Sequence, residues 1–230
     1  MKPITENSIE TFAIEVLQSV GWAYVHGLAI APKAEQAERE NFEQIVLIDR
    51  LRKSIAVLNP NIPHDAREQA IQKVLRIASP ELLHNNEEFH RLLVEKVKIP
   101  YQQNGYERSH EVALIDFENT GNNQFLIVNQ YTIIENNQNK RPDVLLFVNG
   151  LPLVVIELKN AASENANIKS AYQQIQTYKA IIPSLFIYNA ICILSDGLEC
   201  KAGSVSADLS RYMTWKTADG IKEASRFKPQ

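Results

Sequence analysis

The chain has 230 residues, 45% of them hydrophobic, and a formal net charge of −3 with a pI near 6.0. This size and composition fit one large folded domain, or one domain with a small helical subdomain. The net negative charge argues against a protein that holds nucleic acid by bulk charge alone, although it permits a local cationic groove.

Nothing in the sequence predicts export or membrane insertion. No run of eighteen apolar residues occurs, the N-terminal residues are polar, and the two cysteines are Cys192 and Cys200. Transmembrane helices need longer apolar runs, and secreted domains use cysteine more densely. We therefore expect a cytoplasmic protein without a membrane partner.

The N-terminal part has helical periodicity. Apolar spacing predicts a helix over residues 5–20, which Gly21 ends and which carries Glu6 and Glu10 on one face. These carboxylates are either solvated or turned toward a site, and the pattern leaves both open. Further helices are expected over 38–58 and onward to about 97, which together form a helical insert over about 38–98. The insert has a mild basic bias, interpreted either as a solvated surface or as a contact for the DNA backbone.

In the rest of the chain, apolar residues recur with a period of two, which is typical of strands. The expected elements are strands over 107–117 and 125–134, a hairpin over 141–160, a helix over 165–182, a strand over 185–194 and a short strand over 198–202. Strands and helices that alternate in this way predict an α/β fold with a mixed central sheet flanked by helices.

The hairpin carries three charged side chains in apolar strands. Its sequence is RPDVLLFVNGLPLVVIELKN, with Asp143 at the start of the first strand and Glu157 and Lys159 near the end of the second. Because strand side chains alternate, Glu157 and Lys159 share a face. Charges inside apolar strands are costly unless they are paired or bind something. The hairpin therefore holds either a buried ion pair or a functional site.

Two carboxylates beside an ammonium suit metal-assisted attack on a phosphodiester. Asp143 and Glu157 would hold Mg²⁺ through oxygen, and the carbonyl of Leu158 would add a further oxygen ligand. The cation would activate water and neutralise charge on the phosphate. Lys159 would orient the nucleophile, stabilise the transition-state charge, or act as a base if its pKa were depressed.

Hairpin register tests this interpretation. A two-residue loop at Asn149-Gly150 without a bulge pairs Asp143 with Ile156, which turns Asp143 away from Glu157. Metal binding therefore requires an odd loop or a bulge. We expect a three-residue loop over 148–150, with Gly150 left-handed, that pairs Asp143 with Val155 on the same face as Glu157.

Gln174 and Tyr178 lie four residues apart on the following helix and project together, either as part of a half-buried helix or toward the site. The histidines show no ligand-like spacing. No G-x-x-x-x-G-K-[ST] loop occurs, so we expect no ATP site in this chain.

The combined motifs resemble a known nuclease family. Pro142-Asp143 with Glu157-Leu158-Lys159 is similar to the PD-(D/E)xK signature, and QIQTY, from Gln174 to Tyr178, is similar to the Q-x-x-x-Y motif of its RecB-like branch. Glu10 matches by placement the helix-borne glutamate of such nucleases, with Glu6 as its rival. The stretches VNGLPLVVIELKN, SAYQQIQTYKAIIPSLFIYNA and YMTWKTADG resemble the N-terminal region of the restriction (R) subunit of type I restriction-modification enzymes.

This resemblance implies a PD-(D/E)xK restriction-endonuclease-like core and Mg²⁺-dependent cleavage of double-stranded DNA. It implies a nuclease domain over residues 1–217, with its core in 5–30 and 107–202, and a linker over 218–230 toward a motor domain that is absent from this chain. ATP would serve only that motor. The implied partners are double-stranded DNA and the specificity and modification subunits.

Two other functions stay open. The chain could be a docking module for the modification enzyme that does not catalyse, with the helical insert as its working surface. It could also be a stand-alone nuclease or junction resolvase of the same superfamily.

Overall fold

The structure, a computed structural model, describes residues 5–160 and 167–214. Its centre is a seven-stranded sheet in the order β1-β4-β7-β8-β9-β10-β11. The strands are β1 (Ala23–His26), β4 (Phe125–Asn129), β7 (Val144–Val148), β8 (Leu151–Leu158), β9 (Ile191–Ser195), β10 (Cys200–Gly203) and β11 (Met213–Thr214). The pairs β1–β4 and β8–β9 are parallel and the others are antiparallel, so the expected mixed α/β fold is confirmed.

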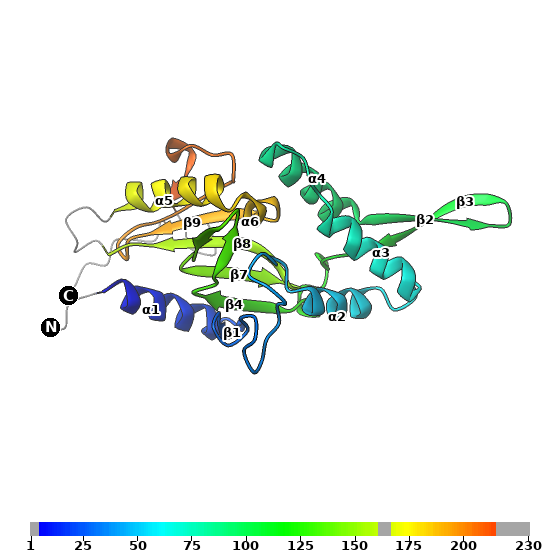
Figure 1. Cartoon of the computed structure of the whole chain (residues 1–230), viewed down its shortest axis with the longest axis horizontal. Coiled ribbons are helices and arrows are strands. Elements are labelled where there is room, and N and C mark those ends of the chain that lie inside the picture. The colour runs from blue at the N-terminus through cyan, green and yellow to red at the C-terminus, as the bar shows by residue number, and fades with distance from the viewer. Residues whose placement is uncertain (1–4, 161–166, 215–230) are drawn as a thin grey trace.

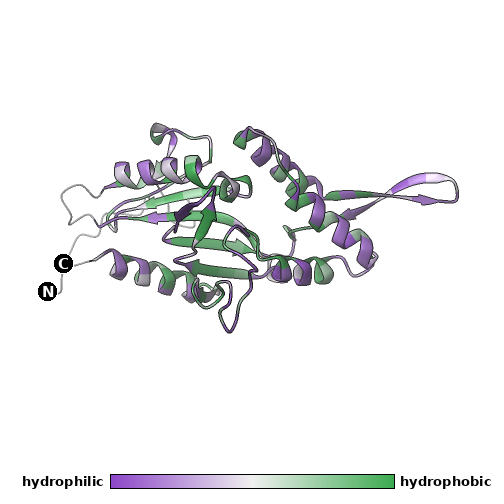
Figure 2. Cartoon of the chain, in the orientation of Figure 1, coloured by the Kyte–Doolittle hydropathy of each residue, from purple (hydrophilic) through white to green (hydrophobic). Residues whose placement is uncertain are grey.

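Helices cover both faces of this sheet (Figure 1). Helix α1 (Glu6–Ser19) packs Ile14 against Ile127 and Ile156 on one face. Helices α5 (Ile168–Ile181) and α6 (Pro183–Ile187) lie on the other, where α5 contacts β8 and β9. The central strands are hydrophobic along their length, whereas the helices turn polar residues outward (Figure 2). Strands buried on both faces read as continuous apolar runs, which explains the composition of β7 and β8.

A second body of structure extends from one end of the sheet. It contains α2 (Ile48–Leu58), α3 (His64–Leu75), α4 (Leu82–Glu95) and the separate antiparallel pair β2 (Val97–Gln103) and β3 (Tyr106–Val112). The β2–β3 pair, called the arm from here on, projects along the long axis of the molecule (Figure 1). The remaining elements are short: η1 (Thr120–Asn122), β5 (Ile133–Glu135), β6 (Gln138–Lys140) and η2 (Leu209–Arg211).

The expected helix over 38–58 is wrong in its first half, because α2 begins only at Ile48. The preceding segment is irregular and held by distant partners. The Leu47 amide donates to the Gly150 carbonyl at 3.0 Å, and the Phe42 carbonyl accepts from the Ile134 amide at 3.1 Å. Leu47 is fully buried. Tertiary hydrogen bonds and burial therefore override the local helical spacing here.

The strand expected from Glu107 does not belong to the central sheet. It is β3, which pairs with residues 97–103 through a turn at Asn104-Gly105. The strand expected over 185–194 is also partly wrong, since α6 occupies its start and β9 begins at Ile191. Pro183 sits at the first turn of α6, where its missing amide is tolerated, so it begins a helix as well as ending one.

Residues 215–230, which include the expected linker, lie outside the described residues. Within the described part of the chain, every helix is too short or too polar to cross a bilayer. The division into a core, an insert and a linker stays a prediction, and so does the cytoplasmic location.

Candidate active site

A bulge in β8 decides where the acidic side chains of the hairpin point. Val148 pairs with Leu151, so the loop has two residues, Asn149 and Gly150, and the expected three-residue loop is wrong. The register then shifts, because Leu146 pairs with Val154 whereas Phe147 pairs with Pro152. The extra residue is therefore Leu153, in the strand rather than in the loop.

The shift aligns the two carboxylates. Val144 pairs with Ile156, so the next positions, Asp143 and Glu157, lie opposite each other and share a face. We expected Asp143 opposite Val155 and diagonal to Glu157; the structure places it two residues farther along β8, directly opposite Glu157. The bulge supplies the one extra, unpaired residue that the metal-site interpretation requires.

Hydrogen bonds fix the three charged groups at this end of the hairpin. The Leu158 amide donates to Asp143 Oδ2 at 2.8 Å, and Lys159 Nζ donates to Glu157 Oε1 at 2.6 Å. Glu157 is 1% exposed, whereas Asp143 and Lys159 are half-buried. A strand residue directs its N–H and C=O to the same side. The carbonyl of Leu158 therefore emerges on the side of Asp143.

Burial shifts the pKa values of the charged groups in this cluster. Burial, with the charge of Asp143, raises the pKa of Glu157 to about 7, although the Lys159 ammonium opposes the shift. Burial likewise raises the pKa of Asp143. Burial lowers the pKa of Lys159, but the hydrogen bond and charge of Glu157 outweigh it, so that pKa is raised. Lys159 is therefore a cation at neutral pH rather than a base.

The donor set suits a divalent hard cation in one specific respect. Glu157 Oε2 is buried and has no hydrogen-bond partner in the described structure. A buried carboxylate oxygen without a partner is costly, and a cation bound between Glu157 and Asp143 would satisfy it. Among the described residues, no group of three or more His, Cys, Asp or Glu side chains forms a metal cluster. The site therefore offers two carboxylates and a backbone carbonyl, and their role as metal ligands stays a prediction.

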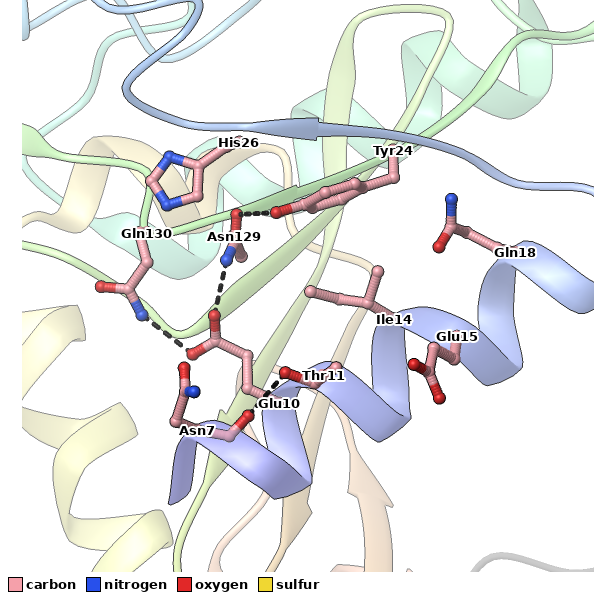
Figure 3. A pocket seen from close by; sticks show the side chains of 10 residues that line it. All are labelled: Asn7, Glu10, Thr11, Ile14, Glu15, Gln18, Tyr24, His26, Asn129 and Gln130. Carbon is pink, nitrogen blue, oxygen red and sulfur yellow. Dashed lines mark hydrogen bonds between the residues drawn. The ribbon is translucent and has the colours of Figure 1, made fainter. Parts of the chain in front are cut away.

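Glu10 is turned inward rather than toward solvent (Figure 3). Its Oε1 accepts from Asn129 Nδ2 at 2.6 Å, and its Oε2 accepts from Gln130 Nε2 at 2.9 Å. Tyr24 donates its hydroxyl to Asn129 Oδ1 at 3.0 Å and so fixes that amide. Of the rivals, Glu10 is buried and held, whereas Glu6 is exposed; both line the same cleft as Asp143.

Gln130 connects Glu10 to the hairpin. Its side chain holds Glu10, while its backbone amide donates to the Asp143 carbonyl at 3.0 Å. It has a φ of 53°, which only a few per cent of non-glycine residues adopt. A backbone conformation of this kind is held by its surroundings and is typical of functional sites. Gln130 therefore positions two acidic residues from different elements.

Tyr178 and Gln174 project from α5 toward the same end of the hairpin. Tyr178 is buried and donates its hydroxyl to the Arg141 carbonyl across 3.4 Å, a long hydrogen bond. Burial and the charges of Glu157 and Asp143 raise the pKa of Tyr178, whereas a hydrogen bond with Gln174 lowers it. The structure thus gathers all the predicted site residues at one end of the sheet, from α1, β7, β8 and α5.

Sequence comparison now decides the family. The model of the type I restriction enzyme R protein N terminus matches residues 3–211. This chain belongs to that family. It is 38% identical to the type I restriction enzyme HindI endonuclease subunit of Haemophilus influenzae over 225 residues, which are 97% of this chain and 21% of that protein.

A second relative is a provisionally named type I restriction enzyme MjaIXP endonuclease subunit of Methanocaldococcus jannaschii. It is 34% identical over 211 residues, which are 90% of this chain and 20% of that protein. The R-protein N-terminal chain thus spans about a fifth of the length of these relatives.

Sequence reasoning missed three residues of this R-protein N-terminal site. The expected strand over 125–134 contains Asn129 and Gln130 without a role for either, and Arg141, which lines the cleft beside Asp143, stands at the edge of the expected hairpin. Two polar amides at the end of an apolar strand are a usable signal, because strand ends are where such folds place functional side chains. No signal pointed to Arg141.

Proposed function

We propose that this chain is the nuclease domain of a type I restriction R subunit and cleaves double-stranded DNA with Mg²⁺. The observation that carries the proposal is the bulge at Leu153, which brings Asp143 opposite Glu157 and leaves Glu157 Oε2 buried without a partner. A bulge that serves only to terminate pairing has no need to align two carboxylates whose burial and mutual repulsion raise the pKa of Glu157.

Asp143, Glu157 and the Leu158 carbonyl would hold the cation. When bound, Mg²⁺ supplies a Lewis acid that acidifies water and neutralises charge on the phosphate. Lys159, which donates to Glu157 Oε1, would also donate hydrogen bonds to the phosphate or the attacking water.

The surrounding residues would orient this machinery. Gln130 and Asn129 hold Glu10 at the wall of the cleft, where its charge adds to that of Asp143. Arg141 lines the same cleft and presents a cation to the phosphodiester of an incoming strand. Tyr178 and Gln174 close the site from α5 and reduce the access of bulk water to Glu157.

The test is DNA cleavage by the complete restriction complex assembled with Glu157→Gln. Glutamine keeps the shape but loses the charge, so cleavage should fall by about a thousandfold, as for other groups essential to charge stabilisation. Glu43→Gln is the matched control, since Glu43 is exposed and remote from the cleft. Cleavage by the Glu157→Gln complex at the control rate would exclude the proposed site.

The wider setting is also part of the proposal. The relatives are named as endonuclease subunits of type I restriction enzymes. We propose that the domain works in a cytoplasmic complex with specificity and modification subunits, coupled to an ATP-driven motor. Target recognition and translocation would then come from those parts, which fits the net charge of −3 on this chain.

A further inference from the structure

The arm projects away from the central sheet, and its residues 102–109 are exposed. The N-terminal end of α1, which lines the carboxylate cleft, lies at the opposite end of the long axis (Figure 1). Only the base of the arm is buried, through Val97, Ile99 and Val112, whereas Tyr106 near its tip is 72% exposed. Isolated two-stranded ribbons are marginally stable, and a polar ribbon that projects into solvent adds little to the core. Its length therefore calls for a functional explanation.

Strand alternation sorts the arm's side chains into two unlike faces. The regular register pairs Tyr101 with Arg108 and Gln103 with Tyr106. Since paired residues share a face, one exposed face, called the aromatic face, consists of Tyr101, Gln103, Tyr106, Arg108 and His110. The arm's two carboxylates, Glu107 and Glu111, both lie on the opposite face. The aromatic face thus contains no acidic group.

The aromatic face is built for a polar, anionic partner. Residues 101–110 contain no aliphatic side chain, whereas protein interfaces have an apolar core. The rings of Tyr101 and His110 stack with centroids 4.2 Å apart and an interplanar angle of 15°. Gln103 and Arg108 add hydrogen-bond donors of the kinds that contact base edges and phosphates.

Arg108 is the cation of this face, and within the described residues it has no ion-pair partner. Lys73, Arg76 and Lys98 line a groove between α3 and the base of the arm, which also contains the carboxylates of Asp65 and Glu68. Lys98 lies on the opposite face of the arm, in register with Glu111. The aromatic face therefore carries a cation and no carboxylate, a local feature that allows an acidic protein to bind a polyanion.

We propose that the aromatic face of the arm binds duplex DNA at a segment remote from the phosphodiester in the cleft. A two-stranded ribbon fits the major groove, and the opposite placement of arm and cleft separates the two contacts along the DNA. The choice of duplex DNA over RNA rests on the proposed function. The binding itself needs neither metal nor cleavage.

The experiment measures binding of the whole chain to a labelled duplex about 30 base pairs long, roughly three helical turns, by fluorescence anisotropy in low salt with EDTA. Arg108→Glu and Tyr106→Ala change the aromatic face. Lys53→Glu reverses a charge of the same sign on the exposed side of α2, and Gln102→Ala changes the opposite face of the arm. Circular dichroism verifies that each variant is folded.

Arg108→Glu should weaken binding by about tenfold, as for the loss of one specific contact, and Tyr106→Ala by a similar factor. Both controls should bind as the unchanged chain does. The proposal is overturned if the chain does not bind the duplex, if the arm variants bind normally, or if Lys53→Glu is equally harmful. It is also overturned if the arm variants instead block assembly with the modification enzyme, which would make the arm a protein interface.

The result is separable from the nuclease proposal. Glu157→Gln should bind the duplex as tightly as the unchanged chain in EDTA. Cleavage by the Glu157→Gln complex at the control rate, with binding still weakened by the arm variants, would remove the nuclease assignment alone. Lost cleavage by that complex, with normal binding by the arm variants, would remove only the arm assignment.

Discussion

Two hairpins of this molecule turn through the same dipeptide and serve opposite ends of it. The arm turns at Asn104-Gly105 and the central hairpin β7–β8 at Asn149-Gly150, and all four residues have positive φ. Such turns match the twist of paired strands and favour Asn-Gly. The arm continues in perfect register, whereas β8 accepts an extra residue.

The comparison shows that the position of a hairpin's turn and the pairing of its side chains are determined separately. The Asn-Gly turn sets where each hairpin reverses, but it does not decide which side chains face each other farther along. In the arm, uninterrupted alternation separates acidic from aromatic residues. In the central hairpin, the bulge at Leu153 brings two acidic residues together. The same turn thus supports charge separation in one hairpin and charge concentration in the other.

The largest effect on stability is expected where the two turns differ in their surroundings. A Cβ at Gly150 would lie 2.4 Å from the Leu47 carbonyl oxygen and 2.8 Å from the Leu51 amide nitrogen, whereas a Cβ at Gly105 meets nothing within 4 Å. Gly150→Ala should lower the free energy of unfolding by about 3 kcal/mol or more, and Gly105→Ala by about 1 kcal/mol. Urea denaturation measures both, and equal losses would show that the central turn is not clamped.

The next largest effect is the pH dependence of stability that Glu157 causes. Because burial raises the pKa of folded Glu157 to about 7, above its ordinary value, the folded state favours the protonated form. In EDTA, the free energy of unfolding should therefore fall as pH rises from about 4.5 to 7, by on the order of 2 kcal/mol.

Glu157→Gln should show a smaller fall, since glutamine does not ionise and Asp143 is then the carboxyl of the pair whose pKa burial raises. Glu43→Gln should retain the full fall. Chemical denaturation over this pH range gives the comparison. Because a metal ligand must be deprotonated, Mn²⁺ affinity of the unchanged chain should rise over the same range. A free energy of unfolding that does not change with pH would contradict the raised pKa of the buried Glu157 carboxyl group.

A smaller effect is expected at the residue that ties Glu10 to the hairpin. Gln130→Met removes the amide but keeps the length of the side chain, so Glu10 loses one of its two donors. Mn²⁺ binding should weaken by about tenfold, as for loss of a residue that orients the ligands. Gln138→Met, at the exposed β5–β6 turn, is the control. Calorimetric titration would reject the role if both variants bound alike.

The smallest effect is expected from Tyr178→Phe. Its hydroxyl makes a long hydrogen bond of 3.4 Å to the Arg141 carbonyl, whereas its ring fills the core beside α5. Thermal unfolding should therefore show a loss of less than about 1 kcal/mol. Tyr178→Ala should cost about 3 kcal/mol or more, because it removes the buried ring. A large loss for phenylalanine would mean that the hydroxyl holds the strand end.

The elements near the site were predictable because local signals agreed with the fold. Thr5 and Asn167 cap α1 and α5 with their side chains. The charged positions of the hairpin were evident from the cost of burying them. The need for an odd residue followed from counting alone, although its location at Leu153 did not, since nothing in an apolar run of Leu, Pro and Val identifies which residue leaves the ladder.

The remaining errors came from contacts that local patterns do not contain. Helical spacing in residues 38–47 gave way to the contact between Leu47 and Gly150, over a hundred residues away in sequence. The arm was missed although Asn104-Gly105 signals a hairpin, because the preceding helix was extended over the start of β2. Asn129 and Gln130 gain their importance only from Glu10, which lies on another element.

The bulge also restricts how the number of residues between Asp143 and Glu157 can change. An odd number of residues separates Asp143 from Glu157, and a two-residue turn without a bulge can only bring residues into opposition across an even number. A single codon gained or lost between them would therefore invert one carboxylate, and a second change in the same strand would restore it. Insertions and deletions should thus be tolerated here only in pairs, whereas in the loops around the sheet they can occur singly.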